Sequence, residues 1–484
     1  MKTACIIGGG LGGLMTGALL TKEGYRVTVL EQHAALGGGL QNFSRKGHLF
    51  DPCMHIFGGL QPGGNLRMLL EYLGVMDRLH IEPYFDTLVD GEEKITLPSG
   101  REAWVKAVGQ GEHIDELNAY VDALYRYAGT EDLFNMRPDT GERHEEPNIS
   151  AKELIAKYIS DPKLQRRLAG IVHLYAGTSD SPALIHALIS VLHIEGVYSL
   201  SPSVKSLADA LCDIITAGGG SFLTHTRVTT LEAKDGQVSA VVCGDKRFEA
   251  DCYISAISIG ALLQLAPPEA FSPAFRKRIS QAPQSSSAFC VYAILKPHSL
   301  PFNHENYHIS RPGTDPWIMS DCTPDQWPQN MFLMPYAAAA DPRYAEKITI
   351  VAPMDYGFVR QWEDTTTGHR PDDYLSWKEQ MAQQALQLAR EAIGPMEIEA
   401  LYTASPLTIR DYNNTTLGSC YGLHASVENP LLTTLSPRTR LPNLFLTGQD
   451  VNFHGMVGTS LTAILTAEAI VGHNAIVNKI ISES

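Results

Sequence analysis

The chain has 484 residues, of which 44% are hydrophobic and 19% charged, a composition typical of globular rather than disordered proteins. This length exceeds what one compact core holds and predicts two domains. The formal net charge of −15 argues against nucleic acid as a partner, because phosphate binding needs clustered Lys and Arg.

The eight cysteines are scattered and form no C-x-x-C pair, which favours reduced thiols and gives no reason to expect a metal site. No stretch approaches 18 uninterrupted apolar residues, so we do not expect a transmembrane helix. We therefore expect a cytoplasmic protein and leave peripheral contact with a membrane open.

The first 31 residues predict a βαβ unit, with a strand at 3–7, a helix at 11–24 and a strand at 25–31. Gly8-x-Gly10-x-x-Gly13 follows the first strand, and its glycines allow a tight turn, close approach to a pyrophosphate and close helix–strand packing. Glu31 ends the second strand, where a carboxylate binds ribose hydroxyls and repels a 2′-phosphate. The unit predicts a dinucleotide site that disfavours NADP, but it does not separate NAD from FAD.

A second glycine-rich loop follows where a nicotinamide enzyme would start another βα unit. Gly37, Gly38 and Gly39 lie just past the expected ribose site, where a longer cofactor such as FAD could continue. His55 follows this loop and is a candidate proton donor, although a buried histidine bonded to backbone is the alternative. Asp51 could stabilise His55, bind the flavin or only form a turn beside Pro52.

Residues 65–200 predict a mostly helical region, with helices at 65–74, 113–129 and 181–196. Tyr175 and Tyr198 could line a substrate channel, but packed tyrosines with satisfied hydroxyls are the alternative. His193 and Glu195 fall at the end of the third helix, where we expect a solvated face. The stripe Ile185, Leu188 and Leu192 is expected to face the core rather than a membrane.

Residues 203–220 predict an amphipathic helix that ends in glycines, so no second nucleotide site is expected there. Strands are predicted at 221–233 and 237–244, joined by a hairpin turn at Asp235-Gly236, and a further strand at 248–258. Mixed strands and helices are expected from 270 to 405. The final part of the chain, 406–484, predicts a strand, the glycine-containing segment 447–458 and a helix.

These motifs together resemble the FAD-dependent phytoene desaturase, carotenoid isomerase and retinol saturase superfamily, and most of all its retinol saturase and carotenoid isomerase branch. The resemblance rests on the glycine pattern with Glu31, LGGG at 36–39, FDPCMH at 50–55, EGVYSLSPSVKSLADAL at 195–211 and LPNLFLTGQDVNFHGMVG at 441–458. It implies an α/β fold, with a discontinuous Rossmann-like FAD-binding domain and an inserted α+β substrate domain. The implied FAD-binding domain takes residues 1–75, 203–268 and 406–484, and the substrate domain takes 76–202 and 269–405.

The resemblance also implies a set of FAD-binding residues. Val228 would contact the adenine, and Asp450 would bind ribityl hydroxyls or water at the pyrophosphate. The first turn of the last helix would stabilise negative charge at the flavin N1 and O2 atoms. His454 would flank the ring, and His55 and His454 are the two catalytic candidates. The full expected set is Gly8, Gly10, Leu11, Gly12, Gly13, Glu31, Gln32, Gly38, Gly39, Leu40, His55, Val228, Gly448, Asp450, Gly455, Met456, Val457 and Gly458.

The function implied is an FAD-dependent oxidoreductase that saturates or desaturates carbon–carbon double bonds of a long apolar polyene or isoprenoid, with an unidentified electron donor or acceptor. A flavin-dependent cis–trans isomerase and an FAD-dependent amine oxidase are the alternatives. Gln449 after Gly448, and the lack of an arginine in the LGGG loop, count against the amine oxidase. A binding protein without turnover is disfavoured because the glycines, Glu31 and Asp450 are intact.

Overall fold

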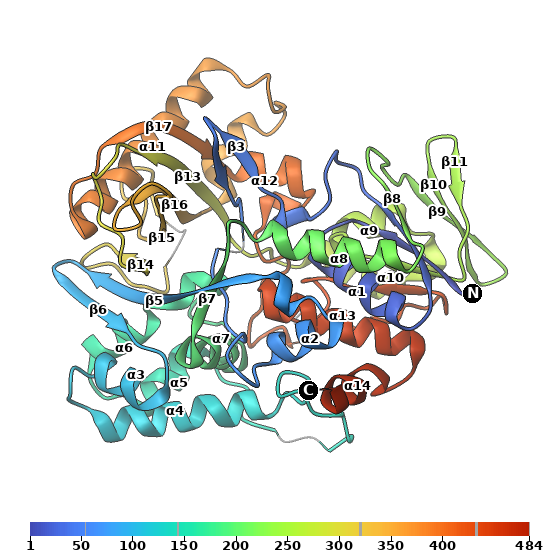
Figure 1. Cartoon of the computed structure of the whole chain (residues 1–484), viewed down its shortest axis with the longest axis horizontal. Coiled ribbons are helices and arrows are strands. Elements are labelled where there is room, and N and C mark those ends of the chain that lie inside the picture. Colours follow the sequence, from blue (N-terminus) through green and yellow to red (C-terminus); the bar gives the residue numbers. More distant parts are fainter. Residues whose placement is uncertain (54, 143–144, 319–321, 431–433, 484) are drawn as a thin grey trace.

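The computed structural model describes residues 1–53, 55–142, 145–318, 322–430 and 434–483. Two large sheets organise the chain, and Figure 1 shows them in different halves of the molecule. The first sheet has five parallel strands in the order β18-β12-β1-β2-β8. Its strands are β1 (Thr3–Ile7), β2 (Arg26–Leu30), β8 (Ser221–Leu223), β12 (Cys252–Ser255) and β18 (Leu444–Leu446).

Three helices pack on or beside this sheet. They are α1 (Leu11–Lys22), α8 (Lys205–Ala217) and α13 (Gly455–Val471), and α1 contacts both of the others. Helix α1 is buried from Leu11 to Leu20, so it is enclosed on every side. Near-continuous apolar strands and buried helices are what a parallel sheet covered on its faces requires. The predicted βαβ unit and the expected Rossmann-like α/β fold are confirmed.

A small antiparallel sheet extends from the same half of the molecule. It contains β9 (Thr230–Lys234), β10 (Gln237–Cys243) and β11 (Lys246–Phe248). Asp235 and Gly236 both have positive φ between β9 and β10, which confirms the hairpin turn. The single strands expected at 221–233 and 248–258 are wrong, because each segment leaves one sheet and enters another. Residues 224–229 cross between β8 and β9, and 249–251 between β11 and β12.

The second large sheet is mixed and has eight strands. Its order is β17-β13-β16-β15-β14-β5-β6, with β7 paired to β5. Most neighbours are antiparallel, but β5 and β14 run parallel. The strands are β5 (His80–Asp90), β6 (Glu93–Leu97), β7 (Val197–Ser201), β13 (Ser287–Leu295), β14 (Glu305–Ser310), β15 (Asn330–Ala337), β16 (Ala345–Met354) and β17 (Ile398–Ala404). The long helix α11 (Asp372–Ile393) buries Met381, Ala385 and Leu386 in the core that this sheet forms.

A helical layer lies below the eight-stranded sheet in the view of Figure 1. It contains α3 (Arg101–Val108), α4 (Ile114–Gly129), α5 (Ala151–Tyr158), α6 (Pro162–Leu168) and α7 (Ala183–Glu195). The expectation of a mostly helical region from 65 to 200 missed β5 and β6. The place of β5 in the sheet is set by pairing with β7 and β14, and β14 lies far from β5 along the chain.

The remaining elements connect these layers. The helices are α2 (Asn65–Leu73), α9 (Ile259–Leu265), α10 (Pro273–Gln281), α12 (Pro406–Asn413) and α14 (Ala475–Glu483), and β3 (Phe43–Arg45) pairs with β4 (His48–Phe50). Short 3-10 turns cover Gly38–Leu40, Met76–Arg78, Ala169–Tyr175, Pro268–Ala270, Tyr356–Trp362 and Thr416–Gly418.

No helix within the described ranges is by itself long and apolar enough to span a membrane. The bent pair formed by α13 and α14 reaches that length and composition only when both helices are taken together across a 120° break. Most of α13 is buried inside the protein.

Candidate active site

The glycine loop between β1 and α1 forms one end of a large cavity. Gly8 turns the chain with a φ of +101°. A Cβ added to Gly13 would lie 2.1 Å from the carbonyl oxygen of Gly8, so only glycine permits this packing of helix and loop. Gly8, Gly10, Leu11 and Gly12 line the cavity, whereas Gly13 packs behind them.

Glu31 is fixed beside this loop at the end of β2. One carboxylate oxygen accepts the backbone N–H of Gly9 at 2.8 Å, and the other accepts that of His33 at 2.8 Å. Each oxygen keeps a lone pair for a further hydrogen bond. Glu31 lines the cavity together with Gln32 and Val228. These three residues therefore meet where the sequence places the ribose and adenine.

The second glycine loop lies against the first. The backbone N–H of Gly37 donates to the carbonyl of Gly9 at 2.7 Å, and a Cβ on Gly38 would lie 2.9 Å from Cα of Gly10. Gly38 and Gly39 line the cavity. Leu40 does not belong to the lining among the residues that the structure describes. Its side chain is fully buried in the core, so its part in the expected set is packing.

The C-terminal segment closes the same cavity from the side of β18 and α13. A Cβ on Gly12 would lie 2.9 Å from Cα of Gly448, and the hydroxyls of Thr16 and Thr447 lie 3.0 Å apart. Gly455, Met456, Val457 and Gly458 form the first turn of α13 and line the cavity. The backbone N–H groups of a first helical turn, with the positive end of the helix dipole, favour negative charge at this wall.

Asp450 holds this segment in place. Its Oδ2 accepts the backbone N–H of Ile259 at 2.8 Å, at the start of α9. Its Oδ1 is buried and has no hydrogen-bond partner among the described residues. Burial raises the pKa of this carboxyl above its ordinary value, and the N–H groups of Ile259 and Leu423 act in the opposite direction. A buried carboxyl oxygen without a partner at a cavity wall marks a place where a ligand hydroxyl would bind.

The residues fit an extended dinucleotide. The cavity measures about 930 Å³ and joins Glu31 and Val228 at one end to the first turn of α13 at the other. The backbones of Gly10, Gly12 and Gly38 form a cradle with no side chains, which allows a pyrophosphate to approach closely. Asp450 lines the same cavity, and its Oδ1 has no hydrogen-bond partner among the described residues.

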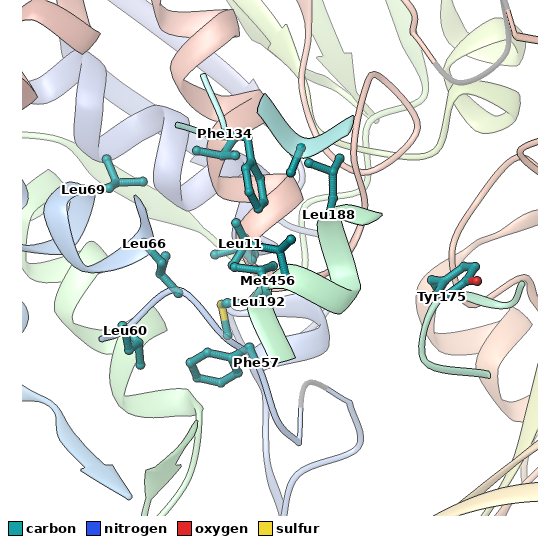
Figure 2. Close-up of a cluster of buried hydrophobic side chains, with 14 of the residues drawn as sticks. Leu11, Phe57, Leu60, Leu66, Leu69, Phe134, Tyr175, Leu188, Leu192 and Met456 are labelled. Atoms are coloured by element: carbon teal, nitrogen blue, oxygen red, sulfur yellow. The ribbon is translucent and has the colours of Figure 1, made fainter. Parts of the chain in front are cut away.

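The cavity continues beyond α13 as an apolar space. Leu188 and Leu192 of α7 line it, together with Phe134. Figure 2 shows these side chains beside Leu11 and Met456, which lie at the start of α1 and α13. The stripe on α7 is buried, as expected, and it also forms a cavity wall, which the sequence did not indicate.

Neither tyrosine proposed for a substrate channel lines the cavity within the described part of the chain. Tyr175 is buried away from the group in Figure 2, and its hydroxyl is 2.9 Å from Nδ1 of His186. Tyr198 pairs through its backbone with Phe57. The alternative, packed tyrosines, is confirmed for Tyr175. Tyr292, Tyr402 and Tyr421 line the cavity instead.

The two expected catalytic histidines both line the cavity. His55 has its Nδ1 3.2 Å from the hydroxyl of Tyr336, and its ring stacks on Phe332. His454 contacts the ring of Tyr421 edge to face. The Nε2 atom of each histidine is buried without a partner among the described residues. Burial lowers the pKa of both imidazoles to about 4, so both are neutral at pH 7.

Asp51 does not pair with His55. It accepts a hydrogen bond from the Ser203 hydroxyl and another from the backbone of Val204, and so fixes the start of α8. Burial raises the pKa of Asp51 to about 6. Holding the start of α8 is a structural role that differs from the three considered for Asp51.

Sequence reasoning missed a buried group of ionisable residues at the cavity wall. His193 is not on a solvated face: its side chain is only 10% exposed, lines the cavity and bonds to Asp86. Asp86 also bonds to His308. No local pattern could have found the group, because Asp86 and His308 are joined only by the pairing of β5 with β14.

The fold and the site define a protein that holds an extended dinucleotide next to an apolar cavity. A family model for flavin containing amine oxidoreductases matches residues 11–471. The chain belongs to this family. Because the family carries a flavin and the site has a dinucleotide pattern, the cofactor is FAD and the protein is an FAD-dependent oxidoreductase.

Individual relatives agree with the resemblance seen in the sequence. The all-trans-retinol 13,14-reductase of Rattus norvegicus is 24% identical over 97% of this chain and 86% of its own length. A 4,4'-diapolycopene oxygenase of Methylomonas is 24% identical over 49% of this chain and 51% of its own. The crystal structure of an oxidoreductase from Methanosarcina mazei has the same fold, with a TM-score of 0.67, 17% identity and coverage of 96% of this chain and 100% of that one.

Proposed function

We propose that the protein saturates or desaturates a carbon–carbon double bond of a long apolar polyene or isoprenoid. The observation that carries this proposal is the continuous cavity, in which the apolar wall of α7 follows directly on the first turn of α13. Bound FAD supplies hydride exchange at its N5 atom. The names of the relatives support the substrate class, since one reduces retinol and another acts on diapolycopene.

The chain's own residues would orient both molecules. Glu31 and Val228 hold the adenosine end, and Asp450 binds a ribityl hydroxyl. Leu188 and Leu192 exclude water and hold the apolar chain of the substrate. The first turn of α13 stabilises negative charge beside the ring. His55 and His454, which line the cavity, would contact the reacting region as neutral imidazoles.

The division into domains is part of the proposal. Strands of the parallel sheet come only from 1–75, 203–268 and 406–484, whereas the eight-stranded sheet uses 76–202 and 269–405. If this division is also functional, FAD slows backbone hydrogen exchange mainly in the first three ranges. A polyene then slows it mainly in the other two. Equal protection of all five ranges by FAD alone would contradict the division.

The function is tested with the purified holoenzyme under anaerobic conditions. The flavin is reduced with dithionite, excess reductant is removed, and all-trans-retinol or a carotenoid is added. Loss of polyene absorbance together with return of the oxidised flavin spectrum is the expected result. A change of polyene isomer without flavin oxidation favours the isomerase. Bleaching of the oxidised flavin by a simple amine, with no reaction of any polyene, favours the amine oxidase and overturns the proposal.

The proposal also includes an external electron donor or acceptor and peripheral contact with a membrane. The cavity contains one dinucleotide pattern among the described residues, so we propose that an external donor or acceptor exchanges electrons with the flavin. Flotation of the protein with vesicles of neutral phospholipid tests the membrane contact. Protein that stays entirely in the vesicle-free fraction excludes it for this lipid.

A further inference from the structure

Four buried side chains from four different elements form one hydrogen-bonded network. Asp86 of β5 lies at its centre and is 1% exposed. One of its carboxylate oxygens is 2.5 Å from Nδ1 of His193, and the other is 2.9 Å from Nε2 of His308. Nδ1 of His308 is 3.0 Å from Nε2 of His173. The network therefore runs from His193 through Asp86 and His308 to His173.

Both ends of the network reach the cavity, and its middle does not. His193 and His173 line the cavity, whereas Asp86 and His308 lie behind the wall. His193 follows Leu192 in α7, and a Cβ on Gly58 would lie 2.7 Å from Cβ of Leu192. His193 therefore belongs to the wall that packs against the loop carrying His55.

Asp86 supplies the negative charge of the network. Burial opposes ionisation of this carboxyl, but His193 and His308 together lower its pKa well below the ordinary value. The carboxylate must then accept both hydrogen bonds, so Nδ1 of His193 carries a proton. Nε2 is the ring nitrogen of His193 that Asp86 does not engage, and His193 lines the cavity.

The two ends are not equivalent. Burial and the neighbouring His308 lower the pKa of His173 well below its ordinary value, so this end stays neutral. His55 and His454 resemble His173, because burial lowers their pKa values and no carboxylate bonds to either within the described chain. Among these cavity histidines, His193 is the one with a carboxylate in direct contact.

We propose that His193 is the catalytic acid and base for the substrate carbon and that Asp86 is its positioning residue. The inference rests on the proposed function and adds a step to it. In saturation, a hydride adds to one carbon of the double bond, and the π electrons form a new C–H bond with the Nε2 proton of His193. His193 is left neutral, with Nδ1 keeping its proton in the hydrogen bond to Asp86, and solvent returns a proton to Nε2. Desaturation runs in reverse, with neutral His193 accepting the proton.

The test compares three variants of the holoenzyme. His193→Gln removes the acid, and Asp86→Asn keeps the size of the positioning side chain but removes its charge. His186→Gln is the matched control: it changes another buried histidine of α7, which bonds to Tyr120 and Tyr175 and does not line the cavity in the described structure. Flavin content and thermal unfolding are measured for each, so that a folding defect is separated from a chemical one.

Two measurements decide the proposal. In a single turnover of dithionite-reduced enzyme with all-trans-retinol, His193→Gln should be slowed at least ~100-fold and Asp86→Asn at least ~10-fold, with His186→Gln close to wild type. In the oxidised protein, NMR should show a strongly downfield Nδ1–H proton of His193 that moves upfield or disappears in Asp86→Asn. The signal does not depend on turnover. Its presence in the wild type reports the pair of Asp86 and His193 whether or not a variant is stable.

The outcomes separate the inference from the function on which it rests. If wild type consumes retinol and His193→Gln does so within threefold of that rate, the proton role of His193 is overturned and the proposed function stands. A missing downfield signal in wild type overturns the positioning role of Asp86. If wild type acts on no polyene, the proposed function fails and the inference fails with it.

Discussion

Gly12 and Gly448 lie near opposite ends of the sequence, yet a Cβ on the first would lie 2.9 Å from Cα of the second. This approach joins the loop after β1 to the loop after β18, and the cofactor cavity lies where they meet. Gly12→Ala should therefore force the loops apart, destabilise the fold by about 1–3 kcal/mol and lower flavin occupancy. Thermal unfolding and the visible spectrum measure both effects. Gly129→Ala is the control, since an added Cβ there meets nothing within 4 Å, and an equal effect of both substitutions would contradict the prediction.

Glu31 should dominate the affinity for FAD. Its carboxylate is held by Gly9 and His33, and Glu31→Ala removes both this support and the hydrogen bonds to ribose hydroxyls. Hydrogen bonds to a charged group contribute about 1.5–3 kcal/mol each, so affinity should fall at least ~10-fold. FAD titration of the apoprotein measures the change, with the exposed Glu112→Ala as control. Unchanged flavin content in Glu31→Ala would mean that this end of the cavity does not hold the ribose.

Substitution of Leu188 should weaken substrate binding and leave FAD binding unchanged. Leu188→Gln places an amide on the apolar wall, where an unpaired polar group costs about 1–3 kcal/mol. We expect KM for all-trans-retinol to rise by about 5- to 100-fold while bound FAD is retained. Leu375→Gln, on an exposed part of α11, should change neither. Loss of FAD in Leu188→Gln without any change in KM would place the substrate elsewhere.

His55 should matter less for proton transfer than its position suggests. Burial lowers its pKa to about 4, so at pH 7 it has no spare proton to give and acts only as a hydrogen-bonding neutral ring. We expect His55→Gln to reduce the turnover rate at pH 7 by less than ~10-fold, compared with ~100-fold for a lost general acid. Steady-state rates from pH 5 to 8 check this. A loss as large as that of His193→Gln would return the acid role to His55.

His186 gives a measurable pH dependence of stability. Burial lowers its pKa in the folded protein to about 4, whereas the unfolded chain has the ordinary value of 6.5. Between these values the unfolded chain binds a proton that the folded chain does not. Stability is thus complete above pH 6.5 and is lost as the pH falls toward 4, by about 1.4 kcal/mol per pH unit.

His186→Gln removes this proton uptake, so its stability should fall less steeply between pH 6.5 and 4. Urea unfolding at half-unit steps of pH measures the slope for the apoprotein. Asp51 acts in the opposite direction, since burial raises its pKa to about 6, but it is common to both proteins. The difference between variant and wild type therefore isolates His186, and parallel curves would contradict its buried neutral state.

The parts of the site that were predictable are those encoded by local patterns. The first βαβ unit, the two glycine loops and the Asp235-Gly236 turn each need only neighbouring residues, and all have the expected structure. The pairing of β5 with β14 was not predictable, because it depends on two segments that are distant in the sequence. Asp86, His193 and His308 meet only through that pairing, so a helix-end histidine read alone looked solvent-exposed. The side chain of Leu40, which the motif placed in the cofactor set, is buried in the core, because a motif predicts the position of a residue but not the direction of its side chain.

The strand order β18-β12-β1-β2 has a consequence for biosynthesis. β1 leaves the ribosome long before β12, which pairs with it in the sheet. β18, which pairs with β12 on its other side, is made later still. At 5–20 residues per second, the interval between β1 and β18 is roughly 20–90 s, during which the apolar edge of a half-built sheet stays open. The nascent chain cannot bind FAD in that interval, because Asp450 and the first turn of α13 do not yet exist. Insertion of the flavin therefore has to wait until residues 450–458 have been made, and growth of cells without riboflavin should leave an aggregation-prone apoprotein.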